Sequence, residues 1–273
     1  MTEPRRGRGR PPQVPPVPRE PIGRDRATAS AGPRRPARSR QGPDRPAFPE
    51  DAEIELPVRV RKEIDRLVND RARARDVKLS LSLGVAASEE DDHATARRYL
   101  AWAKHLAPRA TVVREALGIA LYRAGDLKGA LSELQNYRRL SGSDDQNHLL
   151  ADCLRAEGRD PARAVEVGMA LASDPRADVE RRVEAAIVVA AIHLDLSASA
   201  RARATLLPFL EGPDAAAVPE DSVVRLLWMV ADVAEAGGRG QDAVAALERL
   251  LSIDSDFPDA EERLGRLRRE SGR

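Results

Sequence analysis

The chain has 273 residues, with 45 lysine and arginine residues against 44 aspartate and glutamate residues, one cysteine and 3% aromatic residues. This length suits one or two domains, and a single cysteine excludes a disulfide framework and a cysteine-based metal site. The longest uncharged apolar run, residues 185–194, is too short to cross a bilayer, and the Arg- and Pro-rich start shows no secretory signal, so we expect a cytoplasmic protein.

The first fifty residues form a basic segment that is rich in arginine and proline. They hold 12 arginines against 5 acidic residues, together with 12 of the 20 prolines, and Phe48 is their only aromatic residue. Such a segment buries too little apolar surface to offset the entropy cost of ordering it. We therefore expect residues 1–50 to be a disordered tail in front of an acidic body.

Residues 51–76 are predicted to contain an N-terminal helix. Four apolar residues recur there at helical spacing and predict a helix over residues 57–74, namely Val60, Ile64, Leu67 and Val68. No later stretch alternates apolar and polar residues over a sustained length, so we expect no β-sheet.

Residues 77–256 contain a repeat of about 34 residues. Leu83-Gly84 is followed by Leu117-Gly118 at an offset of 34, and Ala96 is followed by Ala130 at the same offset. The later copies are looser, with a spacing that stretches to about 40 and insertions near residues 175–181 and 211–220. Their matching positions are Leu150-Ala151 and Ala164 in the third copy, Val189-Ala190 and Ala202 in the fourth, and Val230-Ala231 and Ala243 in the fifth.

Each copy has the pattern of two helices joined by a short turn. The small residue after the leucine allows the partner helix to approach closely, and a glycine in the turn takes the left-handed conformation that ends a helix. The second helix places an alanine at the closest crossing. One such hairpin cannot bury its own apolar face, so we expect neighbouring hairpins to stack.

This pattern resembles the tetratricopeptide repeat, most specifically in the first three copies. The first copy matches the family at Leu83, Gly84, Ala96, Leu100, Ala103 and Pro108, and the second at Leu117, Gly118, Ala130 and Leu134. The family's tryptophan is absent, and the layout is also similar to uncharacterised tetratricopeptide-repeat proteins of actinobacteria. The resemblance implies an all-α fold, a right-handed α-solenoid of about five hairpins with an additional N-terminal helix and a C-terminal capping helix and tail over residues 257–273.

The repeat positions also predict a buried core. Its expected members are Leu83, Ala86, Ala96, Leu100, Ala103, Leu117, Leu121, Ala130, Leu134, Leu150, Leu154, Ala164, Val189, Ala202, Leu206, Val230, Ala243 and Leu247.

The sequence gives little support for catalysis or metal binding. The four histidines lack zinc-site spacing to one another or to Cys153, and His193 is interpreted as a core residue. Cys153 is interpreted as a small packing residue rather than a reactive thiol. The acidic run 89–92 lacks the glycine and alternating ligands of a calcium loop and is interpreted as a solvated helix N-terminus. We therefore expect no enzyme activity, no metal and no cofactor.

The tetratricopeptide resemblance implies a concave groove lined by the first helices of successive hairpins, which in that family contacts peptides. Leu81 and Val85 stand where the family's clamp for C-terminal carboxylates has lysine and asparagine, so we do not expect that function. The acids and apolar residues of the groove favour a basic or amphipathic segment as partner. The expected groove residues are Glu115, Ile119, Tyr122, Arg123, His148, Asp152, Arg155, Glu184, Trp228, Asp232 and Glu235.

Two functional hypotheses follow from these features. The leading one is a non-catalytic scaffold or adaptor that binds a protein or peptide segment in the groove. The alternative is a nucleic-acid-associated protein whose tail, with arginines in residues 5–10 and at Arg34-Arg35, binds phosphates non-specifically and in a salt-sensitive manner. The opposite charges of tail and body also permit the tail to fold back over the acidic groove. No membrane partner is expected.

Overall fold

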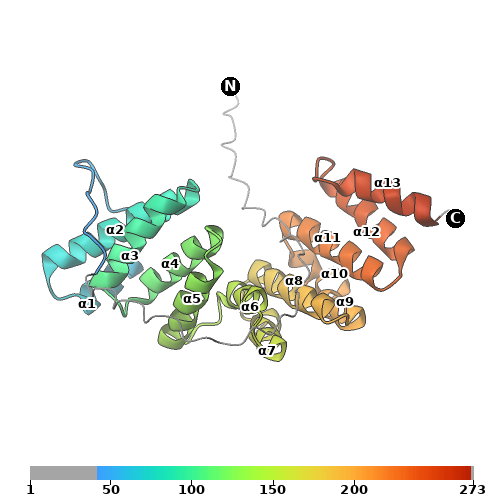
Figure 1. Ribbon diagram of the computed structural model, residues 1–273, viewed down its shortest axis with the longest axis horizontal. Helices are drawn as coiled ribbons and strands as arrows, with labels where there is room; N and C mark the ends of the chain where they lie inside the picture. The colour runs from blue at the N-terminus through green and yellow to red at the C-terminus, as the bar shows by residue number, and fades with distance from the viewer. Residues whose placement is uncertain (1–41, 272–273) are drawn as a thin grey trace, which may run out of the picture. The chain divides into compact units, whose positions relative to one another are not determined.

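The computed structural model describes residues 42–271, and the residues from Asp44 onward form one compact unit. All regular elements of this described part are helical, which confirms there the expectation of an all-α chain without strands. Each helix packs mainly on its neighbours in sequence, so that helical hairpins follow one another in chain order (Figure 1).

Five hairpins correspond to the five copies of the repeat. Their helices are α2 (Arg71–Glu89) with α3 (His93–Leu106), α4 (Thr111–Arg123) with α5 (Leu127–Ser141), α6 (Asn147–Ala156) with α7 (Pro161–Ala172), α8 (Val179–Asp195) with α9 (Ser199–Leu206), and α11 (Glu220–Ala236) with α12 (Gly240–Ile253). The remaining elements are α1 (Val58–Leu67), α10 (Pro208–Glu211), the 3-10 helix η1 (Ala215–Ala217) and α13 (Ala260–Ser271).

The alanine expected at the closest crossing of each hairpin is completely buried. These five residues, each with 0% exposure, are Ala96, Ala130, Ala164, Ala202 and Ala243. Four positions further along, a leucine in four of the second helices is also almost fully buried, namely Leu100, Leu134, Leu206 and Leu247. The repeated sequence positions therefore define the interior of each hairpin.

Glycine in the first helix brings the two helices of a hairpin together. A Cβ atom added at Gly84 would lie 2.6 Å from Cγ of Leu100, and one added at Gly118 would lie 2.8 Å from Cδ2 of Leu134. Each glycine faces the leucine that lies four residues after the buried alanine of its own hairpin. The Gly118–Leu134 pair therefore lies one repeat of 34 residues after the Gly84–Leu100 pair. This close contact between a glycine and a leucine, which we call an interlock, thus occurs twice, one repeat apart.

The turn inside each hairpin closes in the same way in all five copies. One residue has a positive φ, and the second helix starts two residues later, or three in the third hairpin; the five are Asp91, Gly125, Gly158, Ser197 and Gly238. A backbone amide then donates to the carbonyl five residues earlier, at 2.8 to 3.0 Å, in the pairs Asp92–Ala87, Asp126–Leu121, Arg159–Leu154, Ala198–His193 and Arg239–Ala234. This six-residue closure is the Schellman type of helix ending.

Ser197 is the turn residue least suited to its conformation. Its φ of 57° is left-handed, which costs a residue with a side chain about 1 kcal/mol relative to glycine. The greater entropy of glycine in the unfolded chain offsets part of this gain, so we expect Ser197→Gly to raise the free energy of unfolding by about 0.5 kcal/mol. Urea denaturation measures this. Ser199→Gly, in the first turn of α9, should lower stability instead, and a loss of stability in both variants would contradict the expectation.

The N-terminal helix differs from the expected single helix over residues 57–74. Helix α1 ends at Leu67, Val68 is extended, and α2 starts at Arg71. The reason is the side chain of Asp70, which accepts the Arg73 amide at 2.7 Å and caps α2. The boundary expected at residue 76 therefore falls inside α2.

Residues 44–56 form a non-helical N-terminal strap on the first hairpin, with a turn at residues 50–51. The guanidinium of Arg45 binds both carboxylate oxygens of Asp76, at 2.8 and 3.0 Å. The Tyr99 hydroxyl donates to the Ala47 carbonyl at 2.8 Å. The Phe48 ring stacks on the Tyr99 ring, with 5.9 Å between the ring centres. Residues 44–50, which the sequence analysis assigned to the disordered tail, therefore belong to the helical unit. The rest of that assignment, residues 1–41, lies outside the described residues.

Three expected core residues are not buried. Ala86 is exposed because it lies about 200° around α2 from Gly84, on the side turned away from α3. Leu83 and Val230 are half-buried, and they belong to the first and last hairpins, which have one neighbouring hairpin instead of two. The other expected core residues are buried.

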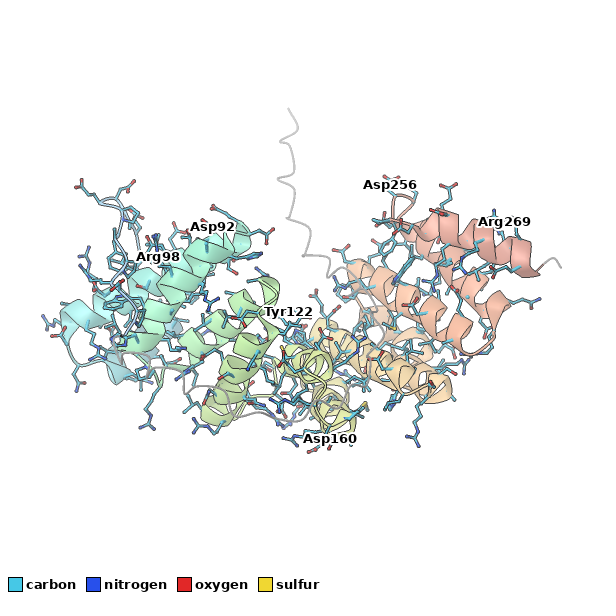
Figure 2. All side chains as sticks on the ribbon, viewed as in Figure 1. Asp92, Arg98, Tyr122, Asp160, Asp256 and Arg269 are labelled. Atoms are coloured by element: carbon cyan, nitrogen blue, oxygen red, sulfur yellow. The ribbon has the colours of Figure 1, made fainter. Side chains whose placement is uncertain are left out.

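Helix α13 covers the last hairpin. It starts at Ala260, later than the expected Phe257, because Asp259 takes a positive φ of 62°. Leu264 and Leu267 are buried in the same apolar cluster as α12. Its outer side carries exposed charges such as Arg269 (Figure 2).

Candidate functional site

The residues expected in the groove all lie on the first helices of the hairpins, and we call them the first-helix face. They occupy α4, α6, α8 and α11: Glu115, Ile119, Tyr122, Arg123, His148, Asp152, Arg155, Glu184, Trp228, Asp232 and Glu235. Most are half-buried, and only Arg123 and Arg155 are exposed. Leu81, expected in the same groove on α2, is only 3% exposed and offers a partner no contact surface.

Three polar contacts connect α4 to the first helices on either side. The hydroxyl of Tyr122, which is labelled in Figure 2, donates to Oδ2 of Asp152 on α6 at 2.7 Å. Gln146, at the start of α6, donates to Oε1 of Glu115 at 2.9 Å. Arg123 donates to the Ser88 carbonyl at the end of α2, at 3.1 Å. The structure therefore brings residues from three successive first helices together.

Asp152 is the centre of a charged group between α6 and α8. Arg155 donates to Oδ2 of Asp195 at the end of α8 at 2.6 Å and lies 3.4 Å from Oδ1 of Asp152. Burial, and then the neighbouring Asp152 charge, raise the pKa of the Tyr122 phenol well above its usual range. Tyr122 therefore stays a neutral donor and holds α4 against α6.

Glu184 connects α8 to α11. Arg225, which the sequence analysis did not single out, lies with its guanidinium 2.6 Å from Oε1 of Glu184. Burial raises the pKa of Glu184, and the positive charge of Arg225 opposes that effect. The pair is partly exposed, with side-chain exposures of 32% and 29%, so it is accessible at the surface of this face.

The three expected residues of α11 meet the capping helix α13. The Arg263 guanidinium lies 2.7 Å from Asp232 and 2.6 Å from Glu235, and it stacks 4.5 Å from the centre of the Trp228 ring. Phe257 packs on the same ring at 5.1 Å. These residues thus join the last hairpin to its cap. Their position in the repeat did not predict these contacts with the capping helix.

The partners that the sequence analysis missed share one signal. Each lies about one repeat length from its partner in sequence, as in Arg155–Asp195, Glu184–Arg225 and Asp232–Arg263. A search for an opposite charge at the corresponding place in the next helical unit could therefore have found these partners.

His148 is a neutral histidine on α6. Its Nδ1 is buried without a hydrogen-bond partner among the described residues, and burial, with a contribution from Arg181, lowers its pKa from 6.5 to about 4. His193 on α8 has a similarly unpartnered Nδ1, and burial lowers its pKa too. His193 is half-buried, so the structure places it at the edge of the core.

The low pKa of His148 predicts an acid-sensitive fold. The unfolded chain binds a proton at this side chain below about pH 6.5, whereas the folded chain does so only near pH 4. The folded state therefore loses stability as the pH falls between these values, by roughly 2 kcal/mol from pH 7 to pH 5. Urea denaturation at several pH values should show a shallower loss for His148→Gln. Equal slopes in His148→Gln and in the parent would contradict the prediction.

The surroundings of Cys153 and of the acidic run 89–92 indicate that both have structural roles. Cys153 is fully buried, and burial, with Asp152 nearby, raises its pKa to about 12, so the thiol stays protonated at neutral pH. In the acidic run, Asp91 takes the positive φ of the first turn and Asp92 accepts the Thr95 amide at 3.0 Å. This agrees with the interpretation of a solvated helix N-terminus. Within residues 42–271, no group of three potential metal ligands is brought together.

Comparisons with known proteins do not identify a family for this chain. Protein-family models give no match, and a comparison with curated proteins gives none either. In the described part of the chain, no helix has the length and apolar character needed to cross a membrane.

Proposed function

We propose that this chain is a non-catalytic scaffold or adaptor, built as a right-handed α-solenoid of five tetratricopeptide-like hairpins. Five turns with the same closure, five buried alanines and the Gly84 and Gly118 interlocks one repeat apart support the repeat. Helices that pack in chain order support their stacking. The capped ends are consistent with a fold that closes its apolar surface without a partner.

The observation that carries the functional proposal is the continuity of the first-helix face. Tyr122–Asp152, Arg155–Asp195 and Glu184–Arg225 link α4 to α6, α6 to α8 and α8 to α11. These side chains remain partly accessible, and their mutual contacts fix their positions before any partner arrives. Binding to such a preordered surface costs less conformational entropy than binding to mobile side chains.

The proposed partner is a basic or amphipathic peptide segment. On α4, α6 and α8 the face offers the acids Glu115, Asp152 and Glu184 around the half-buried Ile119 and Tyr122. Each acid already has at least one donor, yet a carboxylate can accept several hydrogen bonds. An incoming lysine or arginine can therefore add to these contacts while apolar side chains of the segment cover Ile119.

A peptide-display selection on the full chain, followed by calorimetry of the selected peptides, tests the proposal. We expect basic or amphipathic sequences, and we expect Ile119→Arg to weaken their binding at least tenfold. Ala204→Arg, an exposed position on a second helix, is the matched control and should leave the affinity unchanged. Equal binding by both variants, with helical circular dichroism retained, would remove the first-helix face as the site.

A further inference from the structure

A cluster of exposed cations on α1, the start of α2 and the α3–α4 connection lies outside the proposed peptide site. Residues 57–78 contain eight basic residues against four acidic ones. Six exposed cations of this region have no carboxylate partner among the described residues, and we call them the α1–α2 basic surface: Arg59, Lys62, Arg66, Arg71, Arg75 and Arg109.

The acids of the same region are already engaged. Glu63 accepts the amide and hydroxyl of Thr111 at 2.9 and 2.8 Å. Asp65 pairs with Lys78 at 2.6 Å, Asp70 caps α2, and Asp76 holds Arg45 of the strap. Glu63 and Asp70 keep their negative charge because their partners are neutral, but the basic residues of 57–78 outnumber the acidic ones by eight to four, so the region carries a net positive charge. Further along the chain, by contrast, many arginines pair with carboxylates of neighbouring helices.

The cations have a regular arrangement on α1. Arg59, Lys62 and Arg66 lie within about 60° of one another around the helix, on the side away from the buried Ile64. At the end of this stripe lies a cavity of about 660 Å³ between α1, α2 and the α3–α4 connection. Arg66, Arg73 and Arg109 line it, together with Asp70, an apolar floor that includes Leu106, and the exposed Leu67. Arg73 donates there to the Leu106 carbonyl.

We propose that the α1–α2 basic surface binds the phosphate backbone of a DNA duplex. Guanidinium and ammonium groups bind phosphates directly, and a duplex presents these charges at regular spacing. The surface carries no aromatic residue for stacking on unpaired bases, which a single strand would require. It also has few hydroxyl or amide groups for the 2′-hydroxyls by which duplex RNA is recognised.

Two further observations favour DNA over an anionic membrane. The exposed apolar residues of α1, Val58 and Leu67, are nine positions apart and therefore lie on opposite sides of the helix, so α1 has no single apolar face for lipid. The Arg-rich residues 1–41 hold 11 arginines against 3 acidic residues, and they directly precede the strap that Arg45 attaches to α2. Residues 1–41 therefore add to the positive charge that the chain as a whole offers to a polyanion.

The test is the salt dependence of binding by the full chain to a labelled 20-base-pair DNA duplex, followed by fluorescence anisotropy. We compare the triple variant R59Q/K62Q/R66Q with a matched control, R201Q/R203Q/R249Q, which removes three exposed arginines elsewhere. Since each lost phosphate contact lowers the slope of log K against log salt by about 0.9, the triple variant should lose about 2 to 3 from that slope. Its affinity near 0.1 M salt should fall at least tenfold, and the control should bind like the parent.

Further arms separate the alternatives. Arg109→Gln, on a different element, should lower the slope by about 1 even if the triple variant folds poorly. The tail variant R5Q/R6Q/R8Q/R10Q measures the contribution of the first residues. The proposal fails if the triple variant matches its control, if only the tail variant changes the slope, if a duplex RNA binds as tightly as the DNA, or if phosphatidylserine vesicles are bound in preference to DNA. None of these outcomes depends on whether the first-helix face binds a peptide.

Discussion

Ala130→Glu is expected to unfold the second hairpin and, with it, the helices stacked on either side. Ala130 has no exposed surface and sits where α5 crosses α4, so the glutamate would place an unpaired charge in an apolar interior. We expect a loss of more than about 4 kcal/mol of unfolding free energy, the range reserved for buried charges and large cavities. Circular dichroism and urea denaturation measure it.

The matched control is Ala245→Glu, which places the same side chain at an exposed position on another second helix, α12. It should change the free energy of unfolding by no more than about 0.5 kcal/mol. If Ala130→Glu kept the helical signal and the midpoint of the parent, Ala130 would not lie at a helix crossing, and the assignment of the repeat would be wrong.

Glu133→Ala should cause the second-largest loss of stability. The Glu133 carboxylate on α5 is 7% exposed and binds Lys104 of α3 at 2.8 Å and Arg114 of α4 at 2.5 Å, so one side chain joins three helices. Removing it leaves Arg114 without a carboxylate in a largely buried place. We expect a cost of about 3 kcal/mol, at the lower end for a broken buried ion pair because Lys104 keeps access to water.

Urea denaturation of Glu133→Ala beside Glu166→Ala checks this expectation. Glu166 also pairs with an arginine, Arg163 at 2.7 Å, but the two side chains are 69% and 49% exposed. Exposed pairs contribute little, so the control should lose less than about 0.5 kcal/mol. Similar losses in the two variants would show that the three-helix junction is not specially stabilising.

Glu133 illustrates what the sequence could not predict. Its burial depends on Lys104 and Arg114, which lie on two other helices, and no local pattern sets a buried glutamate apart from a solvated one. Trp228 is a second case. The repeat placed it on the first-helix face, but only the position of α13 shows that Arg263 and Phe257 pack on its ring.

The helical pattern, in contrast, was predictable because it depends on local spacing. Ala96 and Ala130 follow from the offset of the repeat, and both are fully buried. The first turn was harder to predict because Asp91, rather than glycine, takes the positive φ. The division between α1 and α2 was missed because the apolar spacing continues through Val68, while the break depends on one capping carboxylate, Asp70.

The coverings of the two terminal hairpins determine how long the row of hairpins can be. The strap occupies Ser82 and Tyr99 of the first hairpin, and α13 occupies the apolar side of α12 in the last one. A sixth hairpin, or the end of a second molecule, could stack on the first or the last hairpin only after it displaced the strap or α13.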